Sequence, residues 1–156
     1  MRLLKRRAKL SETDLVLIAP PFNRARAVHP FYFTGWAFLP DHWHYVCAPQ
    51  YPATISLTVK SLKQNSMTGI NRHRGTEGEL WQSRFFERAL RTVREHNEKF
   101  EYIHLNPVKT GLVRQPQDRR WSSGNEYSGM GANEHEQRCG LTIHRVRMPV
   151  DPCSRI

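Results

Sequence analysis

The sequence is poor in cysteine and in long apolar runs, and each shortage excludes a class of protein. Its three cysteines, Cys47, Cys139 and Cys153, are odd in number and widely spaced, which argues against a disulfide framework and against a C-x-x-C zinc site. No run reaches the ~18 uninterrupted apolar residues of a membrane span. The polar residues that follow the basic start form no apolar core of a secretory signal. We therefore expect a cytoplasmic protein with no membrane association.

Acidic residues are also scarce relative to basic ones. The 156 residues include 24 Lys and Arg against 14 Asp and Glu, a formal net charge of +10. Such an excess favours a polyanionic partner, and nucleic acid is the better choice when no membrane segment is present. Trp81 is a candidate for stacking on an unpaired base, although packing in the core explains it equally well. The cations that we expect to contact DNA phosphates are Lys60, Lys63, Arg72, Arg74, Arg84 and Arg88.

The length suits one domain, with strands and helices that can be read from the apolar pattern. Aromatic residues predict a strand over 31–38, a turn over 39–41 and a further strand over 42–48. A short helix is expected to begin at Ser11 and to be interrupted at Pro20-Pro21. The remaining predictions are a helix over about 54–67, a basic glycine-containing loop over 69–78, a strand over 80–86 and a helix over 92–105 that ends at Asn106-Pro107.

His42 and His44 flank Trp43 at the start of the second strand. Because residues two apart share a face of an extended chain, the two imidazoles can converge on one metal ion while Trp43 points into the core. Eight histidines in the chain make such a pair easy to obtain by chance. Taken alone, the pair fits two ordinary strand histidines better than a metal site.

Tyr102 and Asn106 are four residues apart on the helix predicted over 92–105, so they lie on one side of it. A divalent cation such as Mg²⁺ or Mn²⁺ can take nitrogen ligands from His42 and His44 and an oxygen ligand from Asn106. It would neutralise a phosphodiester for attack by the Tyr102 hydroxyl. The alternatives are a core tyrosine at position 102 and a helix-capping asparagine at position 106.

Four blocks of the sequence occur in an order typical of a known family. They are Leu39–His44, Leu80–Arg88, Tyr102–Val113 and Trp121–Ser123. Together they resemble the REP-associated tyrosine transposases, which are single-tyrosine HUH transposases of the insertion-sequence kind. The resemblance runs from about Phe31 to Ser123.

The resemblance implies an α+β fold, a ferredoxin-like HUH domain in which helices pack on an antiparallel sheet. His42 and His44 would lie on a central strand, with Tyr102 on the facing helix. By matching position, Tyr102 would form a 5′-phosphotyrosine link to single-stranded DNA and leave a free 3′-hydroxyl, and Asn106 would be the third, polar metal ligand. The DNA that the family prefers is a small imperfect hairpin of the repetitive extragenic palindromic (REP) type.

The resemblance also suggests where the domain ends and which alternatives stay open. We assign residues 1–123 to the catalytic domain and 124–156 to an irregular tail. Residues 1–30 depart from the family pattern, with only 1–7 left for the first strand, and this part is read as shortened or degenerate. An inactive relic or a non-catalytic nucleic-acid-binding protein is therefore an alternative, as is a nuclease that uses water. Whether a homodimer forms is left open.

Overall fold

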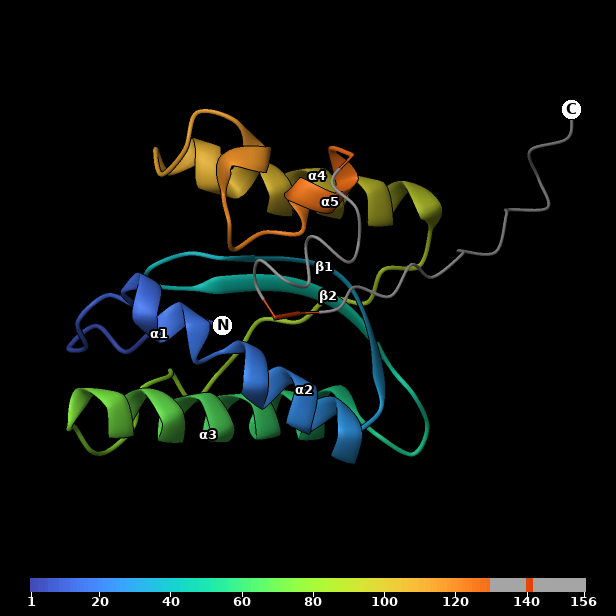
Figure 1. The fold of residues 1–156 in the computed structure, drawn as a ribbon. Coiled ribbons are helices and arrows are strands. Elements are labelled where there is room, and N and C mark those ends of the chain that lie inside the picture. Colours follow the sequence, from blue (N-terminus) through green and yellow to red (C-terminus); the bar gives the residue numbers. More distant parts are fainter. Residues whose placement is uncertain (130–139, 142–156) are drawn as a thin grey trace, which may run out of the picture.

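A two-stranded antiparallel sheet lies between two layers of helices in the computed structural model of this chain (Figure 1). The structure describes residues 1–129, 140 and 141. Strand β1 (Phe31–Phe38) pairs with β2 (Trp43–Pro49), and the register places Ala37 opposite His44. The α+β class and the antiparallel sheet predicted from the sequence are confirmed. The turn predicted over 39–41 is confirmed as well, because the Leu39 amide donates to the His42 carbonyl at 2.8 Å.

Short segments extend this sheet on both sides without forming regular strands. Next to β2, Arg2 forms a bridge with His42, and Leu3 forms a bridge with Trp81. Next to β1, Ser122 forms a bridge with Ala37. The few residues before the first helix therefore do enter the sheet, and they lie between the histidine strand and the segment around Trp81.

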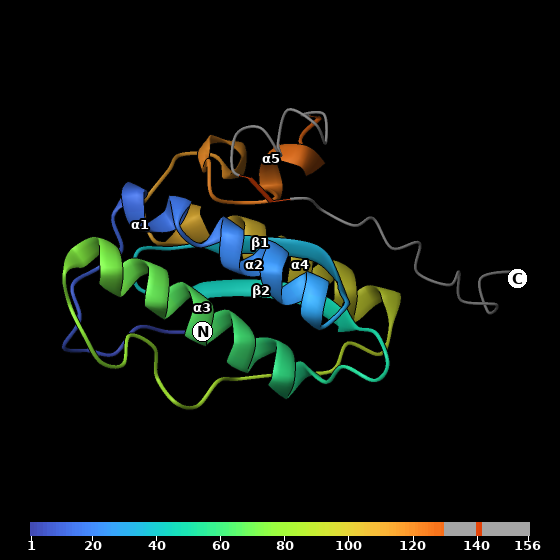
Figure 2. The same cartoon turned by 60° about the horizontal axis from the view of Figure 1, so that its bottom comes forward.

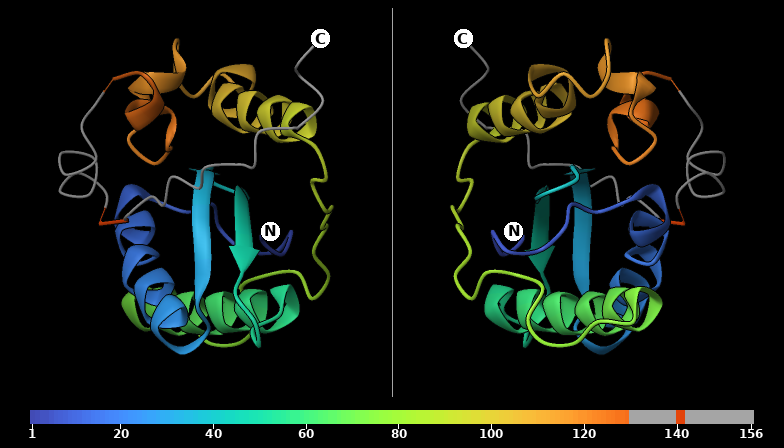
Figure 3. Two further views of the ribbon diagram at one scale, coloured as in Figure 1. Left: turned by 90° about the vertical axis from the view of Figure 1, so that its right-hand side faces the viewer. Right: turned by 90° about the vertical axis from the view of Figure 1, so that its left-hand side faces the viewer.

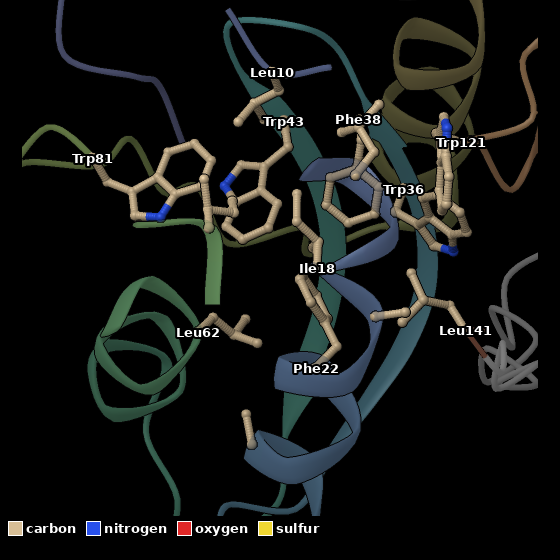
Figure 4. Packing of buried hydrophobic residues seen from close by; sticks show 14 of the residues in the cluster. Leu10, Ile18, Phe22, Trp36, Phe38, Trp43, Leu62, Trp81, Trp121 and Leu141 are labelled. Carbon is tan, nitrogen blue, oxygen red and sulfur yellow. The ribbon is translucent and has the colours of Figure 1, made fainter. Parts of the chain in front are cut away.

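Helices α1 (Glu12–Val16), α2 (Ala19–Val28) and α3 (Ile55–Arg74) cover one face of the sheet (Figures 1 and 2). The main core lies between them and the strands, and it is rich in aromatic rings (Figure 4). Phe22 of α2 packs edge-on against Trp43, with ring centroids 5.2 Å apart. Trp43 in turn stacks on Trp81 at 4.9 Å.

Helix α4 (Val93–Lys109), the short helix η1 (Pro116–Asp118) and helix α5 (Gly124–Tyr127) cover the opposite face (Figure 3). Gly35 of β1 allows α4 to approach closely, since a Cβ at this position would lie 2.8 Å from the ring of Phe100. Ile103 packs beside it on Ala37 and Leu39. These contacts fix the rotation of α4 about its axis, and therefore which of its side chains face the sheet.

Several predicted boundaries are wrong, each for a local reason. The helix predicted over about 54–67 continues to Arg74, because Ile70 and Asn71 are buried and Gly75, in the left-handed region at φ 61°, ends it. The glycine-containing loop predicted over 69–78 is therefore helical over its first half. Pro20 and Pro21 begin α2 instead of interrupting a helix, since the first turn of a helix needs no amide donor there.

Two further predictions need correction around α4. Residues 80–86 form no strand beyond the single bridge at Trp81. Helix α4 continues through Pro107 to Lys109 and ends before Gly111, which has a φ of 71°. The predicted helix start is nearly correct, because Thr92 is the N-cap and its side chain accepts from the Glu95 amide.

Part of the predicted tail is packed on the domain. The Tyr127 hydroxyl donates to the Thr34 carbonyl at 2.9 Å, and Leu141 is buried in the main core. Residues 130–139 and 142–156 of the predicted tail lie outside the described residues. Among the helices of the described part, none has the length and apolar character needed to cross a bilayer.

Candidate metal and nucleophile site

The two histidines of the H-x-H motif lie at the start of β2, on the same face of the sheet. Their ring centroids are 4.9 Å apart, while Trp43 between them is buried in the main core on the other face. This alternation is what the extended backbone predicts. His42 Nδ1 forms a 2.8 Å hydrogen bond with Asp41 Oδ1. A carboxylate at one ring nitrogen orients the other nitrogen for a ligand, and a carboxylate is one of the partners that metal-binding histidines use in this way.

The electrostatics of the pair favour neutral His44. Burial is the main cause that lowers the pKa of His44 from 6.5 to about 4, and His42 and Lys99 add to the effect. Its imidazole is therefore neutral near pH 7 and keeps a lone pair for a cation. At Asp41, burial is the largest single influence and opposes ionisation, but the hydrogen bond and the charge interaction with His42, a backbone hydrogen bond and the charge of Arg2 together hold the pKa of that carboxyl below its ordinary value.

Tyr102 reaches the histidine pair from the facing helix. Its ring centroid lies 5.5 Å from that of His44, in an edge-on arrangement, and the side chain is 40% exposed. Two lysines of α4 lie over the same ring, with Nζ of Lys99 at 4.6 Å and Nζ of Lys109 at 5.5 Å from its centroid. The phenol is thus accessible, adjacent to one imidazole and flanked by positive charge.

Asn106 lies one turn after Tyr102, on the same side of α4. Its side-chain oxygen is buried, and no described residue donates a hydrogen bond to it. Among the described residues, no third His, Cys, Asp or Glu joins the histidines in a cluster suited to a metal. An amide oxygen that lacks a partner, together with two imidazoles, is a donor set that fits a divalent cation such as Mg²⁺ or Mn²⁺.

Two other polar residues of α4 have structural partners. His104 Nε2 forms a 2.7 Å hydrogen bond with Ser123 Oγ, and burial lowers the pKa of His104 to about 4. Glu98 pairs with Arg94 through a 2.8 Å contact on the exposed face of the helix. Both side chains therefore serve the packing and the surface of α4.

Two of the cations predicted to bind DNA are occupied within the protein. Arg74 forms an ion pair with the buried Asp14 at 2.7 Å and also donates to the carbonyls of Ala8 and Lys9. Lys63 Nζ donates to the Gln82 and Ser83 carbonyls at 2.7 and 2.8 Å. These side chains connect α3 to the N-terminal segment and to the chain after Trp81.

The other predicted DNA-binding cations are at the surface, whereas Trp81 is not. Lys60, Arg72, Arg84 and Arg88 are exposed, and Arg88 pairs with Glu95 at 2.7 Å. Trp81 is 4% exposed, stacks on Trp43 and donates from Nε1 to Ser66 Oγ at 3.0 Å. Trp43 covers one face of this ring, which agrees with the packing alternative.

Sequence reasoning missed three features of this part of the molecule. Asp41 directly precedes the first histidine, and Lys99 precedes Tyr102 by three residues on one helix, so spacing could have identified both. Phe86 is 86% exposed in a segment with Arg84 and Arg88. No sequence pattern distinguishes Phe86 from the adjacent Phe85, and only the structure shows that Phe86 is the more exposed of the two.

Comparison with known proteins gives relatives of one kind. The chain is 27% identical over 124 residues to the REP-associated tyrosine transposase of Escherichia coli (strain K12), which covers 79% of this chain and 72% of the relative. It is 29% identical over 105 residues to a putative REP-associated tyrosine transposase of Haemophilus influenzae (strain ATCC 51907 / DSM 11121 / KW20 / Rd), covering 61% of this chain and 60% of that protein. No family model matches the chain.

The fold agrees with these relatives. A solved structure of a REP-associated tyrosine transposase bound to a REP hairpin superposes with a TM-score of 0.70 and 27% sequence identity, covering 80% of this chain and 73% of that one. The resemblance to the REP-associated tyrosine transposases is thereby confirmed in sequence and in fold.

Proposed function

We propose that this chain cleaves and rejoins single-stranded DNA, with Tyr102 as the nucleophile beside a divalent cation held by His42, His44 and Asn106. The observation that carries the proposal is the contact between the His44 imidazole and the Tyr102 ring, 5.5 Å apart across the space between β2 and α4. The unpartnered amide oxygen of Asn106 supports it from the same side of α4. The transposase relatives agree with an enzyme of this class.

The residues of the site divide the chemistry among them. When bound, the cation would neutralise the charge of the phosphodiester and orient its phosphorus. The Tyr102 oxygen attacks phosphorus and loses its proton, while the bond to the 3′ oxygen of the preceding nucleotide breaks and that oxygen takes up a proton. Lys99 and Lys109 supply positive charge where negative charge develops. The products are a 5′-phosphotyrosine and a free 3′-hydroxyl, and attack by another 3′-hydroxyl rejoins the strand.

The proposed substrate is a REP-type hairpin flanked by single strands. The solved structural relative is bound to a REP hairpin, and the formal net charge of +10 suits a polyanion. Exposed Lys60, Arg72, Arg84 and Arg88 are the cations available for its phosphates. Arg74 is left out of this set because its guanidinium is paired with the buried Asp14, whereas the ion pair of Arg88 with Glu95 lies at the surface.

Trapping the covalent intermediate tests the proposal. Incubation of the protein with a labelled REP-type hairpin and Mn²⁺ or Mg²⁺ should give a protein-DNA adduct that survives denaturation. The adduct should be absent with Tyr102→Phe and absent for the wild type in EDTA. Tyr51→Phe is the matched control, because Tyr51 is 98% exposed and lies away from the site, and its adduct yield should equal that of the wild type.

Other outcomes would favour the alternatives. Strand scission without an adduct would indicate a nuclease that uses water. Binding of the hairpin that is unaffected by EDTA, with no scission under either metal, would indicate a non-catalytic DNA-binding protein.

A further inference from the structure

A second site lies on the opposite face of the sheet from the histidines, between the outer side of α3 and the chain that follows Trp81. It is a cavity of about 350 Å³, at the lower end of the ~300–1,000 Å³ range of small-ligand pockets. Ser56, Lys60, Gln64 and Met67 of α3 line one wall. Glu79 and Phe85 belong to the other wall. The segment that carries this second wall continues to the start of α4 (Figure 3).

The walls of the cavity are held in place by contacts within the protein. Positions 56, 60, 64 and 67 recur at helical spacing, so α3 presents them as one stripe. Lys63 fixes the facing segment through its bonds to the Gln82 and Ser83 carbonyls, and its Nζ lies 5.4 Å from the Phe85 ring centroid. Trp81, stacked on Trp43, lines the cavity from the core. The segment facing α3 and the Trp81 ring are therefore fixed in position.

The polar groups of the α3 wall are not used by the protein. The side chains of Ser56, Lys60 and Gln64 make no hydrogen bond or ion pair with any other residue in the described part of the chain. They offer a hydroxyl, an ammonium and a carboxamide, and so both donors and acceptors. Apolar surface from Met67 and Phe85 lies beside them. A flat heterocycle with donors and acceptors along its edge complements these walls.

We propose that this cavity binds one unpaired nucleobase of the DNA, with Gln64 at the base edge and Lys60 near the adjoining phosphate. The proposal rests on the proposed function, because it takes single-stranded DNA as the ligand. Nucleic acid is favoured over a protein segment by the charge: Lys60 and Lys63 line the cavity against one carboxylate, that of Glu79, and the chain carries a large excess of basic residues. Contacts with phosphates carry no sequence information. Recognition of an unpaired base would therefore add a sequence preference that phosphate contacts alone do not provide.

A double-mutant cycle, which combines a substitution in the protein with an abasic site in the DNA, tests this proposal by binding alone and needs no catalysis. REP-type hairpins with single-stranded flanks are prepared with one abasic site at each unpaired position in turn, and affinity is measured by fluorescence anisotropy in EDTA. Gln64→Ala should weaken binding of the intact DNA about two- to tenfold, the value of one net hydrogen bond. At one abasic position, Gln64→Ala should cause no further loss. Thr68→Ala, one turn away on α3 and outside the cavity, should bind every DNA as the wild type does.

The outcomes separate this proposal from the proposed function. If the covalent adduct forms but Gln64→Ala weakens binding equally at every abasic position, or not at all, the base pocket is overturned while the enzyme stands. If the coupling appears but no adduct forms under either metal, the pocket stands and the cleavage chemistry falls. If the wild type does not bind the hairpin, both proposals fall.

Discussion

The histidine-tyrosine site and the residues of α3 and 80–88 that were predicted to bind DNA show how differently a sequence encodes two kinds of function. On β2 and α4, the side chains predicted to act together are placed together: His42 beside His44, and His44 against Tyr102. Around α3 and residues 80–88, residues predicted to share one role are divided between surface and interior. Arg84 is exposed, whereas Arg74 pairs with Asp14 and Trp81 is in the core.

The comparison explains which predictions transfer from sequence to structure. A metal site needs side chains at short spacings on regular elements, and the period of a strand or helix then fixes their direction. A cationic surface needs only exposure, which depends on what else packs nearby. Three pairs of substitutions and one single substitution test the assignments, from the largest expected effect to the smallest.

Loss of one imidazole should affect the first region most. In His44→Ala, the yield of covalent adduct at limiting Mn²⁺ should fall by about 100-fold or more, because residues that merely support a metal ligand already change affinity 10- to 100-fold. His73→Ala, an exposed histidine at the end of α3, should leave the yield unchanged. Equal yields from His44→Ala and wild type would show that His44 is not a ligand.

The two aromatic residues Trp81 and Phe86 should have different roles, the first in stability and the second in DNA binding. Trp81→Ala removes a buried indole and should lower the free energy of unfolding by about 3–5 kcal/mol. Phe86→Ala should leave stability within about 0.5 kcal/mol and weaken single-stranded DNA binding by about 1–3 kcal/mol, the range for stacking on one base. Denaturant unfolding and anisotropy measure the two effects. An unchanged affinity in Phe86→Ala would remove this residue from the DNA surface.

The two arginines Arg74 and Arg84 should also differ, with Arg74 affecting stability and Arg84 affecting DNA binding. Arg74→Ala leaves the Asp14 carboxylate buried without its partner and should cost about 3 kcal/mol of stability. Arg84→Ala should leave stability unchanged and reduce the slope of log affinity against log salt by about one. If Arg74→Ala instead reduced the salt slope with no loss of stability, its assignment as a structural residue would be wrong.

The smallest effect concerns the buried His104 on α4. Its pKa is about 4 in the folded protein, against 6.5 for the ordinary side chain. As the pH falls, His104 therefore takes up a proton in the unfolded chain at a higher pH than in the folded protein. Stability from neutral His104 is therefore complete above pH 6.5 and is lost between pH 6.5 and about 4. After allowance for its partial exposure, His104→Gln should reduce this acid-dependent loss by about 1–2 kcal/mol. Urea unfolding of both proteins at pH 7 and pH 4.5 measures it.

Local sequence determined more of the fold than of the surface. The strand at 31–38, the turn at 39–41 and the Ser11 and Thr92 caps follow from side-chain alternation and hydrogen-bonding side chains within a few residues. The end of α3 does not follow from local sequence. Gly69 favours an end to the helix, but the burial of Ile70 and Asn71 outweighs this preference and the helix continues. The irregular path of residues 80–86 likewise depends on contacts with the N-terminal segment.

At the candidate site, the sequence alone determined which residues could act and which of them share a face. His42 and His44 are paired by the period of a strand, and Tyr102 and Asn106 by the period of a helix. Only the tertiary structure decided that these two faces meet, because the close approach of Phe100 to Gly35 sets how α4 lies on the sheet. It also decided which cations are available to DNA, because an ion pair within the protein depends on a partner that is distant in the sequence. Arg74, for example, pairs with Asp14.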